Sequence, residues 1–214
     1  TYTYDQCYTC TWDGTIANGV WENGWVVAVI DKTATSYAPI ITSINHTNVT
    51  HMYETYRDCT ALITPPEIPN GIVSLEGTFQ NCTALTTAPE IPDGVVRMAA
   101  TFFGCASLTE APTIPEGVTF LILAFYNCSS LQTITLPSLI TEISPYTFSG
   151  CTALTSISMP SQLTSIGYDA FYNCTALTSL IIPNSVLTIG SSAFYNCSSL
   201  EIAPRITSDD NNRT

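Results

Sequence analysis

Apolar side chains recur along this chain with a period of 23 residues. Three columns share that period: a cysteine, a leucine three positions after it and a phenylalanine twenty positions after it. Such columns arise when each repeat forms one coil and equivalent residues stack along an axis. We therefore predict a repeat solenoid with these columns as its interior. The cysteine and phenylalanine columns, named the structural ladder, are Cys59, Cys82, Cys105, Cys128, Cys151, Cys174, Cys197, Phe79, Phe102, Phe125, Phe148, Phe171 and Phe194.

Each coil contains two short apolar runs followed by a turn. Ile157 and Met159 alternate with polar residues, which places both on one face of a short strand. Pro160 ends this strand because proline has no N–H to donate to a ladder. A second apolar run follows in each coil, and residues 169–173 then predict one helical or 3₁₀ turn. The pattern predicts a right-handed coil of short parallel β-strands with short helical turns.

The residue before each ladder cysteine is asparagine, glycine or aspartate. These residue types tolerate left-handed backbone geometry. We therefore predict a corner with positive φ that closes the turn and leads into the next strand. Tyr56 falls in the phenylalanine column, so the register extends back to a partial coil that begins near Ala38.

Two subtypes of coil share the period. The A-P subtype reads C-T-A-L-T-T-A-P-E-I-P after Cys82 and occurs in the coils that begin at positions 59, 82 and 105. The I-P subtype reads like C-T-A-L-T-S-I-S-M-P and occurs in the coils that begin at positions 128, 151 and 174. The final half-coil reverts to the A-P subtype with Ala203 and Pro204.

Two readings of the ladder cysteines are open. Stacked coils bring equivalent Cα atoms to about 5 Å, within disulfide range, but side chains in a stack point the same way, which is poor disulfide geometry. We expect reduced thiols that act as small buried apolar groups. Thiols in a single file also lack the tetrahedral arrangement of a zinc site.

The first 37 residues fall outside the repeat. They contain Trp12, Trp21 and Trp25, and Asn23-Gly24 between strand-like segments is a hairpin signal. Because the first coil of a solenoid needs a cover, residues 1–37 predict a β-rich N-terminal cap, with an assembly segment as the alternative. For Cys7 and Cys10 a local disulfide is favoured, since no second cysteine pair supports a zinc site.

The repeat spans residues 38–206, as seven to eight coils, and a polar tail follows at 207–214. The tail has no apolar residue with which to cover Leu200, Ile202 and Ile206. An uncovered last coil exposes an apolar face and an open strand edge, which favours pairing. Either the chain was cut here or another subunit completes the stack. In the second case the three tryptophans and these three apolar residues form an assembly surface.

Composition narrows the possible partners. The chain has 17 acidic and 5 basic residues among 214, a formal charge of −12. This charge repels phosphate and anionic lipid, which excludes nucleic acid as a partner. No apolar run approaches the roughly 18 residues of a membrane helix. A surface rich in serine and threonine favours an extracellular or cell-surface setting. The opening Thr1, without signal peptide or initiator methionine, indicates a mature or trimmed form.

Candidate chemistry is sparse. His46 and His51 are the two histidines, and neither lies near a nucleophile motif. We find no phosphate loop or metal-ligand set, so we expect no catalytic residues, metal or cofactor, and a chain that is not an enzyme. In a secreted eukaryotic protein, the N-glycosylation acceptors would be Asn45, Asn48 and Asn212.

Residues 170–183 carry the signature A-F-x-N-C-x-x-L-x-x-I-x-I-P. In this signature the chain resembles the BspA-like leucine-rich repeat surface protein family, over roughly residues 38–206. The resemblance implies surface display and a role in adhesion or binding. The expected partner is a protein or glycan ligand, or copies of the chain itself. The alternative function is a structural subunit that self-assembles end to end into a filament or surface layer.

Overall fold

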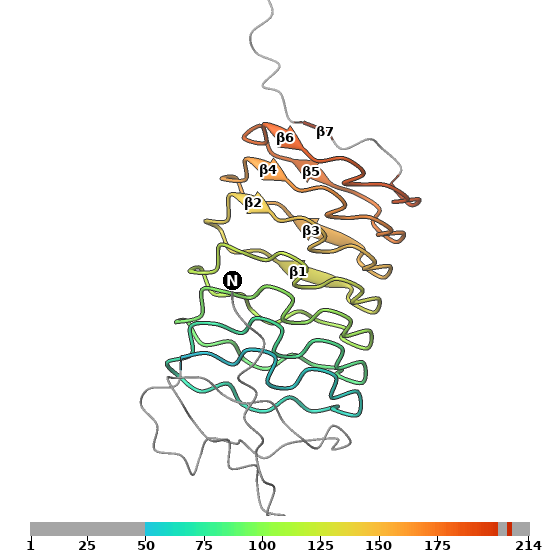
Figure 1. The fold of residues 1–214 in the computed structure, drawn as a ribbon. Coiled ribbons are helices and arrows are strands. Elements are labelled where there is room, and N and C mark those ends of the chain that lie inside the picture. Colours follow the sequence, from blue (N-terminus) through green and yellow to red (C-terminus); the bar gives the residue numbers. More distant parts are fainter. Residues whose placement is uncertain (1–49, 201–204, 207–214) are drawn as a thin grey trace, which may run out of the picture.

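The computed structural model describes residues 50–200 and the backbone of residues 205–206. These residues form the predicted repeat solenoid, in which each coil lies directly on the previous one (Figure 1). The strands are short because every coil turns a corner after two or three paired residues. They are β1 (Thr133–Thr135), β2 (Glu142–Ile143), β3 (Ser156–Ser158), β4 (Ser165–Ile166), β5 (Ile181–Ile182), β6 (Thr188–Ile189) and β7 (Arg205–Ile206).

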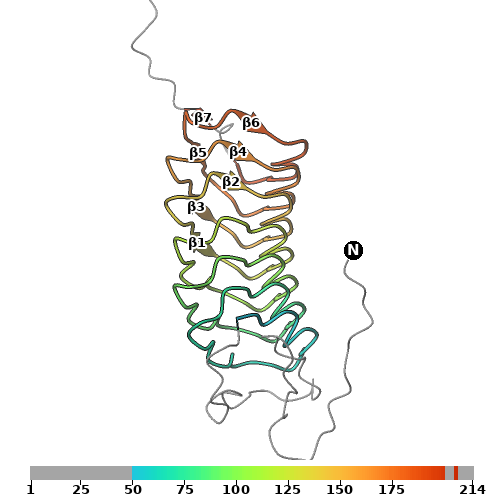
Figure 2. The same ribbon diagram turned by 60° about the vertical axis from the view of Figure 1, so that its left-hand side comes forward.

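The strands form two rows along the solenoid. β1, β3 and β5 lie in the first strand row, and β2, β4 and β6 lie in the second (Figure 2). All recorded pairs are parallel, and Ile134 pairs with Ile157 exactly one repeat later in sequence. In the A-P coils the pairing thins to single bridges such as Thr87 with Glu110. This thinning is expected, because the proline of this subtype removes a donor from the first strand row.

The third side of each coil consists of turns. The structure assigns no helix to any residue it describes, so the predicted helical turn is wrong. Asp169, Phe171 and Asn173 donate their N–H groups to carbonyl oxygens of the next coil at 2.8 to 3.0 Å. Tyr172 and Cys174 donate within their own coil. A helix needs every interior N–H for its own carbonyls, and here alternate N–H groups join neighbouring coils instead.

Two residues in each coil adopt positive φ. The predicted corner before each cysteine is confirmed, with φ of 56° at Asn127 and 78° at Gly150. A second left-handed column lies four residues earlier and was not predicted. It holds residue types as different as Leu123 (φ 59°) and Tyr146 (φ 58°).

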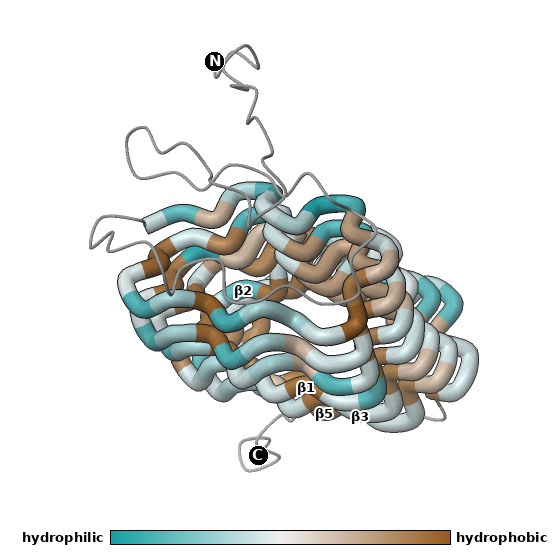
Figure 3. Tube along the Cα trace, turned by 90° about the horizontal axis from the view of Figure 1, so that it is seen from below, coloured by the Kyte–Doolittle hydropathy of each residue, from teal (hydrophilic) through white to brown (hydrophobic). Residues whose placement is uncertain are grey.

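The core is a file of stacked rings. The five phenylalanines from Phe79 to Phe171 have no exposed surface, and Tyr56 continues their column as predicted. Neighbouring rings from Tyr56 to Phe194 stack with centroids 5.3 to 5.8 Å apart. Viewed along the solenoid, apolar residues recur at the same places coil after coil (Figure 3). Each coil therefore buries its apolar surface against its neighbours.

The ladder cysteines form a second interior file. All seven are buried and carry free thiols. From Cys82 to Cys197, each Sγ donates to the backbone carbonyl oxygen of the aromatic ladder residue one coil earlier, at 3.1 Å in every case. Burial raises the pKa of Cys105 to about 12. A cysteine fits this column because it fills a small apolar space and still offers a weak donor to a buried carbonyl.

Several predicted features lie outside the described residues. The N-terminal segment 1–37 is among them, with Cys7, Cys10 and the three tryptophans, and so is the tail 207–214. The roles proposed for residues 1–37, as a cap or an assembly segment, stay predictions.

Replacing Phe171 with alanine should lower the free energy of unfolding by about 3–5 kcal/mol, because it leaves a cavity between two stacked rings. Tyr172→Ala, at the half-buried neighbouring position, should cost clearly less. Urea denaturation followed by circular dichroism measures both. Equal losses for the two variants would show that the phenylalanine file is not the core.

Substitutions at Gly150 test whether the corner before each cysteine requires left-handed geometry. A Cβ there would collide with Oδ1 of Asn127, and φ is left-handed. We expect Gly150→Ala to cost about 1–2 kcal/mol. Gly150→Asn meets the same Cβ contact but should lose less than half as much. Asparagine tolerates this φ better than alanine, and its side chain would form with Asn127 the bond that Asn196 forms with Asn173 at 2.8 Å. The same denaturation assay applies, and a larger loss for the asparagine variant would contradict the explanation.

Candidate binding surface

The first strand row presents a surface rich in hydroxyl groups. Thr133 and Thr135 of β1 and Ser156 and Ser158 of β3 face solvent, while the residue between each pair is buried. Flanking threonines bridge the coils: Thr155 Oγ1 donates to the Gln132 carbonyl oxygen at 3.2 Å. Such a hydroxyl uses its hydrogen inside the protein, so it offers mainly an acceptor oxygen to a ligand.

A change of subtype interrupts this surface between the coils that begin at Cys105 and Cys128. From its cysteine to the proline that ends the first strand, the A-P subtype is one residue longer than the I-P subtype. The same offset is visible where the last coil reverts, since Ile181 pairs with Arg205, 24 residues away. After the bridge of Glu110 with Thr133, no strand pairing or bridge joins residues 111–122 to 134–144 within this described part of the chain.

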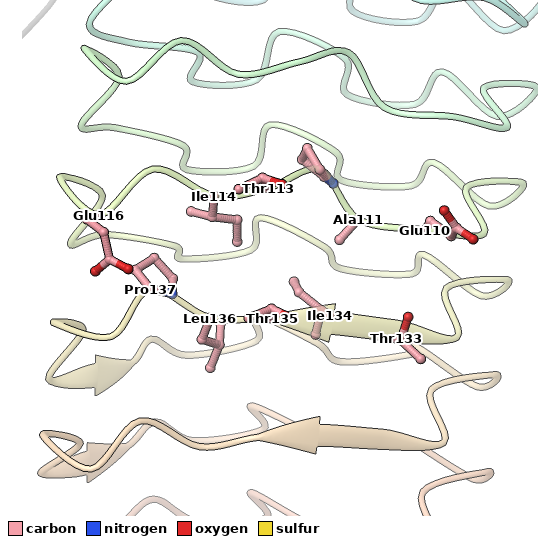
Figure 4. Close-up of a pocket in the computed structure, with 11 residues that line it drawn as sticks. Glu110, Ala111, Thr113, Ile114, Glu116, Thr133, Ile134, Thr135, Leu136 and Pro137 are labelled. Carbon is pink, nitrogen blue, oxygen red and sulfur yellow. The ribbon is translucent and has the colours of Figure 1, made fainter.

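The interruption opens a groove, named here the junction groove. It has a volume of about 380 Å³ and lies between two chain segments that run side by side (Figure 4). Ile114, Ile134 and Leu136 are almost fully buried and supply apolar surface. Its lining consists of Glu110, Ala111, Pro112, Thr113, Ile114, Glu116, Thr133, Ile134, Thr135, Leu136 and Pro137.

Glu116 closes one end of the groove. Its carboxylate accepts the backbone N–H of Ser138 at 2.9 Å and the Ser138 hydroxyl at 3.0 Å. These two hydrogen bonds lower the pKa of Glu116. The bonds replace the missing strand pairing at this corner and hold the carboxylate in place. Glu110 lies at the opposite end (Figure 4).

An outer aromatic row runs along the turn side. Phe103 stacks on Tyr126 with centroids 4.7 Å apart, and Tyr172 stacks on Tyr195 at 5.1 Å. Tyr146 packs edge-to-face between Tyr126 and Tyr168. These ring pairs strengthen the contacts between coils.

Side chains of the corner column form hydrogen bonds with one another. Asn81 donates to the Asp58 carboxylate and Asn196 to Asn173, each at 2.8 Å. The glycosylation candidates Asn45, Asn48 and Asn212 lie outside the described residues, so that expectation stays a prediction.

The predicted assembly residues at the C-terminal end are placed only in part. Leu200 is partly buried and packs against the core. The backbone of Ile206 pairs with Ile182 in the β5–β7 sheet, and Ile202 lies outside the described residues.

Residues 50–200 contain no group of three or more His, Cys, Asp or Glu side chains that could hold a metal ion. Nδ1 of His51 lies 2.8 Å from the Thr50 hydroxyl, and His46 falls outside the described part. Nor does any helix in that part have the length and apolarity to cross a membrane.

The junction groove was not predicted from the sequence. Glu116 and Leu136 are ordinary members of their columns, and no motif marks them. Glu110 is the one charged residue in a column that in the other coils from Cys59 to Cys174 holds Thr64, Thr87, Thr133, Ser156 and Ser179. The available signal was the switch of subtype between the coils at Cys105 and Cys128, together with the one-residue difference in the position of the proline.

The repeat of this chain is similar to repeats in known proteins. The family model described as a BspA type leucine rich repeat region matches residues 122–204 in six copies. A leucine rich cell surface protein of Faecalibacterium prausnitzii is similar over 72% of this chain and 42% of its own, at 29% identity and a TM-score of 0.61. No curated protein matches the chain.

Two further solved structures share the fold. A leucine-rich repeat protein of Eubacterium ventriosum is similar over 89% of this chain and 50% of its own, with 24% identity and a TM-score of 0.68. The T. pallidum leucine rich repeat protein is similar over 82% of both chains, with 23% identity and a TM-score of 0.71. This chain thus spans half or less of the length of the first two structures. Residues 122–204 of this chain therefore match the leucine-rich repeats of the BspA type.

Proposed function

We propose that this chain is a non-catalytic binding module displayed at a cell surface, and that its first strand row contacts the ligand. The observation that carries this proposal is the junction groove, which opens among the exposed hydroxyl groups of that row. Grooves of a few hundred Å³ are typical of binding sites, and the accessible lining of this one is mostly polar. The similar F. prausnitzii protein is itself described as a cell surface protein.

The chemistry of the interior is compatible with an extracellular location. A thiol reacts as its thiolate, so a raised pKa together with burial protects it from oxidation. Burial raises the pKa of Cys82, Cys128 and Cys151 well above the ordinary value. Such a ladder tolerates an oxidising environment without forming disulfides.

The groove supports binding better than catalysis. Its two carboxylates, Glu110 and Glu116, line it without a nucleophile or a general base of different type beside them. Glu116 is also held by Ser138. General acid–base catalysis needs groups free to exchange a proton with the substrate.

We expect a bulky residue on the first strand row to abolish ligand binding. Thr135→Trp places an indole at the groove, and Thr141→Trp makes the same change at an exposed site outside its lining. Binding of fluorescent full-length chain to an array of extracellular-matrix proteins and glycans is the measurement. The wild type and Thr141→Trp should bind the same spots, and Thr135→Trp should lose at least most of that signal. Equal binding by all three proteins would overturn the proposal.

End-to-end assembly is a second candidate, and the exposure of the β6 edge favours it. Ile166 of β4 is 1% exposed, whereas Ile189, its equivalent in β6, is 45% exposed. Leu187 beside it is 81% exposed. Among the described residues β6 is the last strand of the second strand row, and a strand edge with apolar side chains favours pairing with a further strand, from this chain or another.

Sedimentation velocity at micromolar concentration distinguishes the two candidates. A monomeric binding module should sediment as one small species, and negative-stain images should contain no filaments. If filaments form instead, Ile189→Arg should disperse them, because a charge cannot be buried at the edge without a partner. Thr164→Arg, at an exposed site one coil earlier, is the matched control and should leave them intact.

A further inference from the structure

We propose that the junction groove binds an extended segment of a partner protein that carries arginine or lysine side chains. This inference rests on the proposed function and names the class of partner for the first strand row. The groove's shape, its charge and the placement of its two carboxylates each support it.

The shape of the groove suits an extended peptide. One wall is lined from Glu110 to Glu116 and the other from Thr133 to Pro137. At about 3.3 Å per residue, the five residues of the second wall run for roughly 17 Å. Ile114, Ile134 and Leu136 lie between the walls and are 5 to 7% exposed, so the surface that a ligand meets is mostly polar. An extended segment of about five residues would fit this length.

No lysine or arginine near the groove balances the negative charge of its two carboxylates. No lysine or arginine occurs from residue 98 to residue 204. Arg97 forms an ion pair with Glu76 at 2.6 Å, and Arg57 one with Glu54 at 2.6 Å. The two basic side chains of the described region are therefore already paired outside the groove. A partner with basic side chains would supply the missing cations.

The same charge disfavours other occupants. A second copy of this chain has no lysine or arginine between residues 98 and 204 with which to pair the two glutamates of the groove. Nucleic acids and other polyanions are repelled by the formal charge of −12. A neutral glycan could reach the hydroxyl groups but would leave both carboxylates uncompensated.

The two carboxylates define a spacing. Glu110 and Glu116 lie at opposite ends of the groove (Figure 4). In an extended peptide, residues i, i+2 and i+4 face the same side. The arrangement fits basic residues near the two ends of an extended segment. Ser138 fixes the Glu116 carboxylate before the peptide arrives, which lowers the ordering cost of binding.

A fluorescein-labelled peptide Gly-Arg-Ser-Leu-Ser-Arg-Gly tests the inference by fluorescence anisotropy with the full chain at low salt. It should bind, and the matched peptide with glutamate in place of both arginines should not. Glu110→Gln should weaken binding about three- to tenfold, the range for one partly exposed charge pair. Glu142→Gln, which removes an exposed carboxylate from β2, should leave the affinity unchanged.

The inference is wrong if both peptides bind equally, if neither binds, or if Glu110→Gln and Glu142→Gln have the same effect. Binding of a neutral glycan on the array with no binding of the arginine peptide would assign the groove to carbohydrate and also overturn it. In these cases the proposed function stands as long as Thr135→Trp abolishes array binding. If that variant keeps full array binding, the proposed function itself falls, whatever the peptide does.

Discussion

Contact between identical side chains in successive coils is the constraint on which this structure depends. A phenylalanine ring is covered by the rings one coil before and one coil after it, at 5.3 to 5.8 Å between centroids. The cysteine file beside it repeats one S–H to carbonyl bond at 3.1 Å in coil after coil. Because each side chain must fit a copy of itself, a change of size in one coil would disturb two interfaces. Tyr56 is accepted in the phenylalanine column because its ring has the same shape and stacks nearly parallel on Phe79.

This constraint explains why the interior could be predicted from the sequence. A column that must match itself stays constant in residue type, and such a column is visible without any structure. The ends of the first strands were also predictable, since Pro137 and Pro160 cannot continue a ladder. The corner before each cysteine was recognised from the preference of asparagine and glycine for left-handed geometry, and the backbone has it in all seven coils described.

The turn side could not be predicted for the opposite reason. Its second left-handed position holds Leu123, Tyr146 and Asp169 in successive coils, and residue preference does not select positive φ for the first two. Hydrogen bonds to the next coil impose that geometry, and they also replaced the helical turn that the local sequence favoured. The junction groove has a similar origin, because Glu110 and Glu116 gain their meaning only from the coil that follows them. Tertiary contacts decide these positions, and the chain carries no local signal for them.

The change of subtype between Cys105 and Cys128 also divides the solenoid energetically. In a one-dimensional array, the total stability is a sum of coil terms and nearest-neighbour terms, and cooperativity depends on the latter. Pairing in the strand rows stops after Glu110 here, and within the described residues β3 and β5 of the first strand row are not paired either. The nearest-neighbour term is therefore smaller where a strand row is interrupted, and partial unfolding should halt at such interfaces within one continuous stack.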